Sequence, residues 1–341
     1  MPVNPVPAAA PVSLKANGIH ALAPIFDLVA DDFAAVNALI PRELTSDVDL
    51  VEEISQYIVE SGGKRLRPLL VLLGTRCCEY SGTRQLKLAA VIEFLHTATL
   101  LHDDVVDHSS LRRGRKTANA LWGNSSSVLV GDFLYSRAFQ LMVDLDNMSI
   151  MAILSDATNT IAEGEVLQLA NIGNTGLSEA AYMEVIRCKT ALLFQAAAHT
   201  AAVLAGASAD EVQALKHFGL HFGLTYQLVD DWLDYAGDTR TMGKKVGRDL
   251  AEGKLTLPLI QALKTAPERQ VNLIRTSLKT KSNEHLDEIL TILNGCDALH
   301  YTRNAATHQA GLAIDCLTDL RDNEYRDALT TLTRYSISRL S

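Results

Sequence analysis

The sequence is poor in cysteine, and its five cysteines show none of the spacings that are typical of zinc sites or disulfide frameworks. An odd number of cysteines without a CxxC or CxxxH pattern favours a reducing compartment, so we expect a cytoplasmic protein. A long apolar run is also missing, because the longest candidate, residues 88–101, is interrupted by Glu93, His96 and Thr97. A membrane-spanning helix needs roughly 20 apolar residues, so we expect no membrane anchor.

Net positive charge is absent as well. The chain has 31 Lys and Arg against 40 Asp and Glu, which gives a formal charge of -9 at pH 7. This balance argues against the broad basic surface by which proteins bind nucleic acid or anionic lipid. Any anionic ligand must therefore be held locally, by clustered cations or by a metal ion.

Proline is scarce beyond the N-terminal region. Six of the nine prolines lie in the first 41 residues, so long helices are permitted nearly everywhere after them. Ser46 with Asp49, and Ser208 with Glu211, have the spacing of capping boxes that open helices. Apolar residues recur at every third or fourth position, without sustained alternation of period two, over residues 83–108, 147–170, 178–205 and 209–236.

Other familiar patterns are missing, and this narrows the fold. The chain has no strand–helix–strand rhythm, no GxGxxG and no P-loop, which disfavours a Rossmann or kinase-like nucleotide site. We therefore expect an all-α fold, a single large helical bundle. Residues 1–18 are predicted to be a disordered Pro/Ala-rich leader, and residues 19–341 a single all-α domain, because no repeat or linker divides the chain beyond the first 20 residues.

The most informative stretch is an acidic motif that closes an otherwise apolar helical segment. Asp103 and Asp107 are four residues apart and share a helical face, with Asp104 beside them. Like charges at this spacing repel, so we expect a cation between them. Carboxylate oxygens suit Mg²⁺, which binds one or two carboxylates together with water and substrate phosphate oxygens. A solvated acidic helix end would explain one such motif equally well.

A second motif of the same form, made by Asp230, Asp231 and Asp234, follows 127 residues later. Gln227, one turn before it, extends a polar stripe in a segment whose other residues are apolar. Two acidic stripes that face each other would repel unless divalent metal ions lie between them. The pair of motifs therefore predicts a site in which metal ions clamp a diphosphate.

Cationic residues recur beside glycine-rich turns and acidic motifs. Lys64 and Arg67, in the segment GGKRLRP, lie near an expected helix start, where backbone N–H groups also favour anions. Each cation alone is explained by a solvated surface, but their recurrence indicates two phosphate pockets, one lined by metal and one by Lys and Arg. The other positions are Arg112, Arg113, Lys189 with Thr190, Lys244 and Lys254.

Several longer motifs occur in a fixed order: GGKRLRP, HTATLLHDDVVDHSSLRRG, GNSSSVLVGDFLYSRAFQLM, IAEGEVLQL, KTALLF, QLVDDWLDY and GKKVGRDLAEGKLTLP. In these motifs the chain resembles the trans-type (E)-polyprenyl diphosphate synthases, and closely the bacterial octaprenyl diphosphate synthase group. The resemblance implies an all-α bundle around a central cavity, usually a homodimer. It also implies head-to-tail condensation of isopentenyl diphosphate onto an allylic diphosphate, such as farnesyl diphosphate, with Mg²⁺.

The resemblance further assigns roles to individual residues. It implies that Mg²⁺ and the allylic diphosphate are held by Asp103, Asp104, Asp107, Asp230, Asp231 and Asp234. It implies direct contacts to the allylic diphosphate from Arg112, Lys189, Thr190, Gln227 and Lys244. It implies an isopentenyl diphosphate pocket made by Lys64, Arg67, His96 and Arg113. A lone His on an apolar helix is more often a core residue, but His96 lies two turns before Asp103 on the same face.

Small residues precede the first acidic motif. Ala98 and Thr99 lie five and four residues before Asp103, about 6 Å deeper along the helix, where short-chain members of the family have aromatic residues. We expect the prenyl chain to pass Ala98 and Thr99 into an apolar tunnel whose floor involves residues 133–142. Octaprenyl (C40) is the expected product, and heptaprenyl and nonaprenyl stay open. The resemblance alone implies that the product is used for quinone side chains. Because the product is so apolar, we expect the protein to contact a membrane transiently.

Three other functions compete with this one. A terpene cyclase also uses an aspartate-rich motif with Mg²⁺, but it normally has an Asn/Ser/Glu motif at the second site and needs no isopentenyl diphosphate pocket. A metal-dependent phosphohydrolase built on His102 and Asp103 would leave the second motif unexplained. A non-catalytic subunit of a heteromeric synthase characteristically loses its acidic motifs, whereas this chain retains both.

Overall fold

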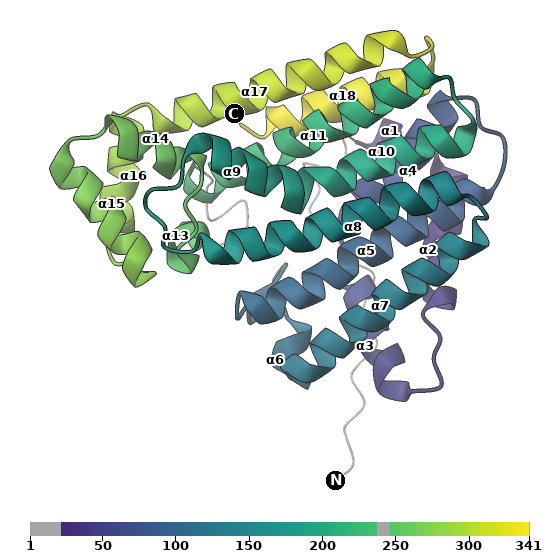
Figure 1. The fold of residues 1–341 in the computed structure, drawn as a ribbon, viewed down its shortest axis with the longest axis horizontal. Coiled ribbons are helices and arrows are strands. Elements are labelled where there is room, and N and C mark those ends of the chain that lie inside the picture. The colour runs from purple at the N-terminus through teal and green to yellow at the C-terminus, as the bar shows by residue number, and fades with distance from the viewer. Residues whose placement is uncertain (1–21, 237–245, 341) are drawn as a thin grey trace.

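The computed structural model describes residues 22–236 and 246–340, and in these ranges the chain folds into a bundle of helices (Figure 1), as predicted. The only strands in these ranges are β1 (Leu111–Arg112) and β2 (Arg115–Lys116), which pair antiparallel as a hairpin. Its two turn residues, Arg113 and Gly114, both have positive φ, which is typical of tight hairpin turns. Within the described ranges, no helix combines the length and the apolar character needed to cross a membrane.

The first half of the chain carries the first acidic motif. α4 (Leu66–Cys77) and α5 (Arg84–Val106) are largely buried, and α7 (Asn124–Asp144) packs along α5. α8 (Met148–Ala170) packs against α10 (Leu192–Ala205), as Figure 1 shows. The shorter helices around them are α1 (Ala23–Asp27), α2 (Ala30–Glu43), α3 (Asp49–Glu60) and α6 (Ala118–Trp122).

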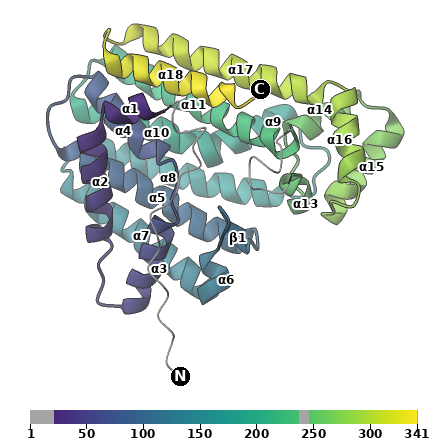
Figure 2. The same cartoon turned by 180° about the vertical axis from the view of Figure 1, so that it is seen from behind.

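The second half carries the second acidic motif, on α11 (Ala209–Ala236), the longest helix among those described. α11 packs between α10 and α17 (Ala298–Cys316), and α18 (Glu324–Ser338) lies beside α17 in Figure 2. The remaining elements are α9 (Glu179–Ile186), the π-helical turn η1 (Arg187–Ala191), α13 (Arg248–Glu252), α14 (Leu257–Thr265), α15 (Glu268–Thr280), α16 (Leu286–Gly295) and the 3₁₀ turn η2 (Leu317–Asp319).

The capping signals have different outcomes at the two positions. The box at Ser208 forms, because Ser208 Oγ accepts the Glu211 N–H at 3.3 Å and Glu211 Oε2 accepts the Ser208 N–H at 2.9 Å. The prediction at Ser46 was wrong. α3 begins at Asp49 with Val48 as its N-cap, so Ser46 lies too early to cap it, and its hydroxyl instead accepts the Val48 N–H at 3.2 Å.

Two hydrophobic clusters meet along α11. Phe218 and Phe222 belong to the larger cluster, which includes residues of α1–α8 and α10, whereas Leu224 and Leu228 belong to the smaller one, which includes residues of α14–α17. The polar stripe of α11 thus begins just after the helix passes from one cluster to the other.

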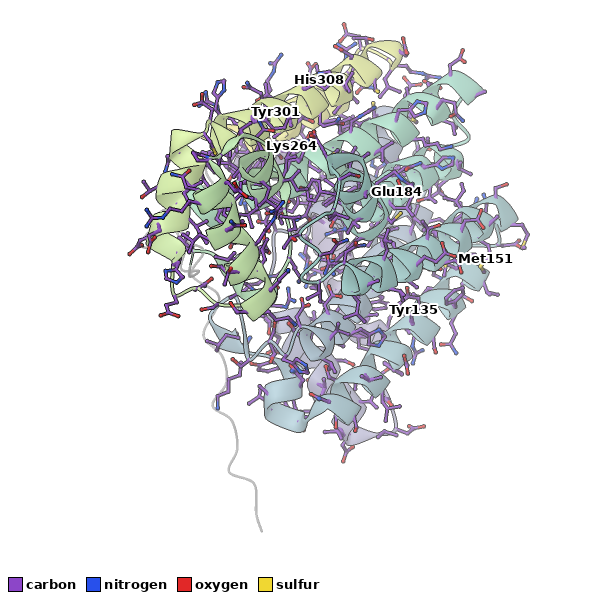
Figure 3. The ribbon with its side chains drawn as sticks, turned by 60° about the vertical axis from the view of Figure 1, so that its left-hand side comes forward. Tyr135, Met151, Glu184, Lys264, Tyr301 and His308 are labelled. Carbon is purple, nitrogen blue, oxygen red and sulfur yellow. The ribbon has the colours of Figure 1, made fainter. Side chains whose placement is uncertain are left out.

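The surface of the second half is also joined by hydrogen bonds. Lys264 of α14 and Tyr301 of α17 (Figure 3) both donate to Glu179 of α9, at 2.7 and 2.8 Å.

Candidate active site

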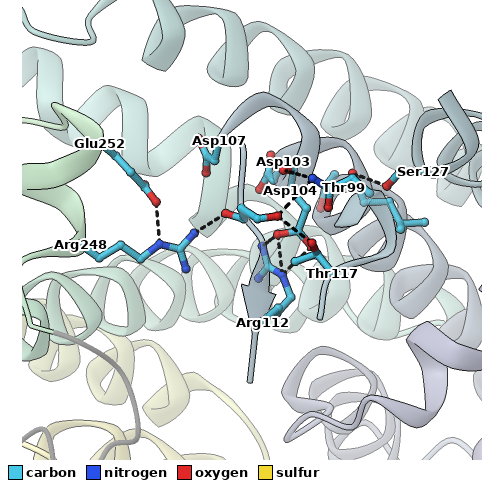
Figure 4. A network of polar contacts seen from close by, with 12 residues as sticks. Thr99, Asp103, Asp104, Asp107, Arg112, Thr117, Ser127, Arg248 and Glu252 are labelled. Carbon is cyan, nitrogen blue, oxygen red and sulfur yellow. Dashed lines mark hydrogen bonds and ion pairs between the residues drawn. The ribbon is translucent and has the colours of Figure 1, made fainter. Parts of the chain in front are cut away.

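The first acidic motif lies at the C-terminal end of α5 (Figure 4). Asp104 is buried, and Arg112 of β1 grips both of its carboxylate oxygens at 2.9–3.1 Å. Burial raises the pKa of Asp104, although the Arg112 charge opposes the shift. Because a helix C-terminus carries partial negative charge, carboxylates here need nearby cations. Arg112 supplies one such cation. Because it pairs with Asp104, the carboxylates of Asp103 and Asp107 are left to contact other side chains.

Two lysines reach the other aspartates of this motif. Lys189 Nζ lies 2.5 Å from Glu165 Oε2 of α8 and 3.6 Å from Asp103 Oδ1. Lys254 Nζ lies 2.9 Å from Asp107 Oδ2 and 2.7 Å from Glu252 Oε2. Burial, with the Asp103 charge nearby, raises the pKa of Glu165 to about 7. The carboxylates therefore exceed the local cations, which is the charge pattern of a site that takes up further positive charge.

The second acidic motif is held by hydrogen bonds. The buried Asp231 accepts from Gln227 Nε2 at 2.7 Å and from the Tyr182 hydroxyl, and Gln227 Oε1 accepts from Thr190 Oγ1 at 2.8 Å. Burial raises the pKa of Asp231 to about 7, and it also raises the pKa of Asp234. Burial is the main cause of both raised pKa values, and the nearby charge of Asp230 adds to them.

α13 joins the two motifs. Asp234 accepts the backbone N–H groups of Arg248 and Asp249 at 3.2 and 3.0 Å, so it caps the start of this short helix. The Arg248 side chain reaches across to Ser109 Oγ at 2.8 Å, two residues after Asp107. The two aspartate motifs, distant in sequence, therefore border one cleft. The adjoining pocket is lined by Lys189, Thr190, Gln227, Asp231, Asp249 and Lys254, among others.

A π-helical turn presents Lys189 and Thr190 together. Lys189 approaches Asp103 on α5, whereas Thr190 bonds Gln227 on α11. Both residues lie in the turn η1, so this one turn contacts the helices of both acidic motifs. It lies against Gly164 of α8, where an added Cβ would be 2.6 Å from the Cys188 Cβ and 3.0 Å from the Lys189 backbone nitrogen. The bare glycine thus lets the two helices approach.

Gly164→Ala is expected to lower kcat about 10- to 100-fold, because displacing the π-turn moves Lys189 and Thr190 by a fraction of an ångström or more. Steady-state kinetics and circular dichroism test this. Gly311→Ala is the matched control, since Gly311 lies in α17 with open space where its Cβ would be and alanine favours a helix. Wild-type kcat in Gly164→Ala would refute the role assigned to this contact.

A second pocket has Asp104 in its lining together with four cationic side chains, and we call it the cation-lined pocket. Arg67 Nη1 lies 3.2 Å from His96 Nε2, and the Arg67 guanidinium stands 4.0 Å from the Phe194 ring centre. Burial lowers the pKa of His96 well below its usual range, so the ring is neutral and can accept from Arg67. Burial also lowers the pKa of Arg67, to about 10, which leaves it charged at neutral pH. The lining includes Arg65, Glu93, His96, Asp104, Arg112, Arg113 and Lys116.

Some candidate residues have neighbours outside the two pockets. Lys64 Nζ stands 5.4 Å from the Tyr335 ring centre of α18, a contact that the sequence did not indicate. Lys244 falls outside the described residues. His102 turns toward α7, where its Nε2 is 3.2 Å from the Val128 carbonyl oxygen and 3.4 Å from Asp132 Oδ1. A phosphohydrolase built on His102 and Asp103 therefore finds no support in the geometry.

The two candidate chain-length residues differ in burial. Ala98 is fully buried in the core, whereas Thr99 is half-buried and its hydroxyl donates to the His96 carbonyl oxygen at 2.8 Å. Thr99 lies one turn before Asp103 on the same helical face, as Figure 4 shows. Residues 133–142 belong to α7, which packs along α5, and Leu134, Ala138, Leu141 and Met142 are buried there.

Sequence reasoning missed two residues of the cleft. Tyr182, whose hydroxyl donates to Asp231, lies in an ordinary apolar stretch that gives no signal. Arg248 lies within a quoted motif, and the positive φ of the preceding Gly247 shows why a glycine stands before this helix start.

Comparison with known proteins agrees with this geometry. A sequence model described as polyprenyl synthetase matches residues 48–294. Octaprenyl diphosphate synthase of Escherichia coli (strain K12) is 47% identical over 316 residues, covering 92% of this chain and 98% of the relative. The crystal structure of a decaprenyl diphosphate synthase from Rhodobacter capsulatus superposes with a TM-score of 0.90 at 43% identity, covering 94% and 99%. A polyprenyl synthase from Caulobacter crescentus CB15, solved with calcium and isoprenyl diphosphate, gives 0.90 at 41% identity, covering 94% and 98%.

Proposed function

The chain belongs to the polyprenyl synthetase family, and from this membership we propose that it is a long-chain all-trans polyprenyl diphosphate synthase. It would extend an allylic diphosphate, such as farnesyl diphosphate, with isopentenyl diphosphate units. The observation that supports this most is the pairing of two pockets around Asp104. One is rich in carboxylates, and the other is lined by His96 and Arg113, with Arg67 in contact with His96. One substrate diphosphate would bind in each.

We propose Mg²⁺ as the metal, held by Asp103 and Asp107 on one side and by Asp230, Asp231 and Asp234 on the other. The donor set fits, because hard carboxylate oxygens are what Mg²⁺ prefers, and a cation would offset the repulsion of Asp230 with Asp231 and of Asp103 with Glu165. Among the described residues, no three carboxylate, His or Cys side chains already form a metal-binding group. This agrees with Mg²⁺ drawing further ligands from water and the substrate diphosphate.

The hard step of the proposed reaction is cleavage of the allylic C–O bond, whose electron pair leaves with the diphosphate. Bound Mg²⁺ supplies positive charge that stabilises this leaving group. Lys189 adds charge from the π-turn, and Thr190 with Gln227 fixes the far wall of the pocket through Asp231. The role proposed for Lys244 and Arg112 is the same, a direct contact to this diphosphate.

The second substrate is positioned without metal. Arg67, His96 and Arg113, together with Lys64, would hold the diphosphate of isopentenyl diphosphate so that its alkene faces the allylic carbon. The alkene donates its electron pair to that carbon, a new C–C bond forms, and the proton that the adduct loses goes to the released pyrophosphate. The neutral His96 leaves the Arg67 charge available for the anion.

Product analysis tests the function directly. Purified protein is incubated with Mg²⁺, farnesyl diphosphate and labelled isopentenyl diphosphate, and the dephosphorylated products are sized by chromatography. We propose octaprenyl (C40) as the product, a length supported by the octaprenyl relatives. A cyclic hydrocarbon would support a terpene cyclase instead. Turnover only after a second protein is added would support a subunit of a heteromeric synthase.

We also propose that the protein is a homodimer. Apolar side chains are exposed on neighbouring faces of α7 and α8, with Val143 and Val166 exposed by 66% and 67%. Tyr135 of α7 and Met151 of α8 lie on the same side of the bundle in Figure 3. Further exposed apolar residues on these two helices are Leu129, Met148, Leu167 and Leu169. A second copy would cover this face.

Val143→Glu combined with Val166→Glu is expected to raise the dimer dissociation constant at least about 100-fold, because like charges brought together at an interface cost several kcal/mol. Light scattering during size exclusion measures the mass. Val48→Glu, at an exposed valine before α3, is the matched control and should stay dimeric. Unchanged mass in the double variant would place the interface elsewhere.

The fate of the product follows from its chemistry. We propose that the protein acts in the cytoplasm and that its polyprenyl diphosphate supplies quinone side chains. Because such a product is far more apolar than the protein surface, its release would involve brief contact with a membrane rather than a permanent anchor.

A further inference from the structure

Glu93 is a half-buried acid that the reaction described above does not use. It lies on α5, three residues before His96, and lines the cation-lined pocket. Its Oε2 atom is shielded from solvent and has no hydrogen-bond partner among the described residues. An unpartnered carboxylate oxygen in such a place is unfavourable unless nearby positive charge compensates it.

Three arginines act electrostatically on Glu93, and two of them, Arg65 and Arg113, line the same pocket. The charges of Arg65, Arg67 and Arg113 all act to lower the pKa of Glu93 against the opposing effect of burial. Arg67 Nε is itself buried without a partner, so a donor and an acceptor near each other both remain unsatisfied. Asp104, another acid of the lining, is already paired with the Arg112 guanidinium. Glu93 is therefore the acid of this lining whose charge is left to act on Arg65, Arg67 and Arg113.

The arginines are fixed on their other sides by packing. Arg67 lies over the Phe194 ring, and Arg113 lies against Gly63, where an added Cβ would be 2.7 Å from Arg113 Nη1. Arg65 donates to Asn37 Oδ1 of α2, and its backbone has a positive φ of 44°, an unusual conformation for a residue other than glycine. Packing thus brings the positive charges of the three arginines close to one another. These charges repel unless a negative group lies near them.

We propose that Glu93 is a positioning residue that holds Arg65, Arg67 and Arg113 in place for the diphosphate of isopentenyl diphosphate. This inference rests on the proposed function of the pocket. The carboxylate offsets the repulsion among the three guanidinium groups before the anion arrives. Their donors then face the pocket in advance, so less side-chain freedom is lost on binding.

Binding of inorganic pyrophosphate in EDTA tests the proposal apart from turnover, because without divalent metal the carboxylate-rich pocket should not take the anion. Glu93→Gln keeps the shape and removes the charge. Its pyrophosphate dissociation constant, measured by calorimetry, is expected to rise about tenfold, the effect of losing one hydrogen bond to a charged group. Glu53→Gln, at an exposed site on α3, is the matched control. Unchanged or tighter binding in Glu93→Gln overturns the proposal, as does absence of pyrophosphate binding to the wild type.

Kinetics separate positioning from a general structural role. In Glu93→Gln the KM for isopentenyl diphosphate should rise about tenfold, while kcat and the KM for the allylic substrate stay within about twofold. Equal losses in all three would contradict positioning. In a double-mutant cycle, Glu93→Gln should add little to the rise in KM for isopentenyl diphosphate that Arg113→Met causes. Both changes would weaken the same contact, that of Arg113 with the diphosphate. Additive losses would overturn the proposal.

Three further outcomes separate failure of this inference from failure to fold and from failure of the proposed function. If Glu93→Gln does not fold, Glu93→Asp, which keeps the charge one methylene further back, takes its place in the cycle and should show a smaller loss of the same kind. If the wild type binds pyrophosphate in EDTA, Glu93→Gln binds it tenfold more weakly, and yet no prenyl product forms, the proposed function fails while the role of Glu93 stands. If product forms and Glu93→Gln equals wild type in binding and in KM, the inference alone fails.

Discussion

Asp103→Asn is expected to lower kcat about a thousandfold. The variant removes the charge of a proposed metal ligand that lies 3.6 Å from Lys189 Nζ, and it leaves the ion pair of Asp104 with Arg112 in place. A metal ion that stabilises a leaving group contributes several kcal/mol, and each 1.36 kcal/mol is a factor of ten in rate. Initial rates with labelled isopentenyl diphosphate, measured over a range of Mg²⁺ concentrations, give both kcat and the apparent metal affinity.

The stability of Asp103→Asn should not fall. A carboxylate at the C-terminal end of α5 opposes the helix dipole and repels Asp107, so removing it is neutral or slightly stabilising. Asp144→Asn, at an exposed aspartate paired with Lys87, is the matched control and should retain wild-type rates. A kcat within tenfold of wild type, with bound Mg²⁺ unchanged, would mean that Asp103 is not a metal ligand.

Thr99→Phe is expected to shift the product from a long chain to one that ends after one or two condensations. Thr99 is half-buried one turn below Asp103, so an aromatic ring there would fill the path of a chain growing away from the diphosphate. Chromatography of the dephosphorylated products measures the length. Thr99→Val, which removes only the hydrogen bond to the His96 carbonyl oxygen, should leave the length unchanged.

Ala98→Phe makes a useful contrast. Because Ala98 is fully buried in the core, a ring there must displace its neighbours, at a cost of about 1–3 kcal/mol in the free energy of unfolding. The expected signature is a lower melting temperature, whether or not the product shortens. Full-length product from Thr99→Phe would show that the prenyl chain takes another route.

The helices were largely predictable, and α11 shows why. The apolar period over residues 209–236 coincides with the helix from Ala209 to Ala236, since a capping box opens it and no proline interrupts it. The period over residues 178–205 is equally regular, yet it contains the π-turn. That turn packs against Gly164 of another helix, where a side chain would collide with it, and a local sequence pattern carries no information on such a contact.

The site was predictable only where charge repeats in a motif. Both aspartate clusters, with Thr190 and Gln227, border one cleft, as their spacing indicated. Tyr182 and Glu93 carry no motif, because each matters through a partner that only the fold brings near. The contact of Lys64 with Tyr335 was not predictable for the same reason, since Tyr335 lies far away in the sequence.

The hairpin of β1 and β2 puts two adjacent arginines to separate uses. Arg112 pairs with Asp104, while Arg113, at the turn, rests on Gly63. In the proposed function Arg112 would contact the allylic diphosphate and Arg113 that of isopentenyl diphosphate, so the two contacts would start from neighbouring Cα atoms, about 3.8 Å apart. An enzyme that repeats one condensation many times on a growing chain needs the same distance between its two diphosphate sites in every round. The rigid peptide unit between Arg112 and Arg113 would help to keep that distance constant.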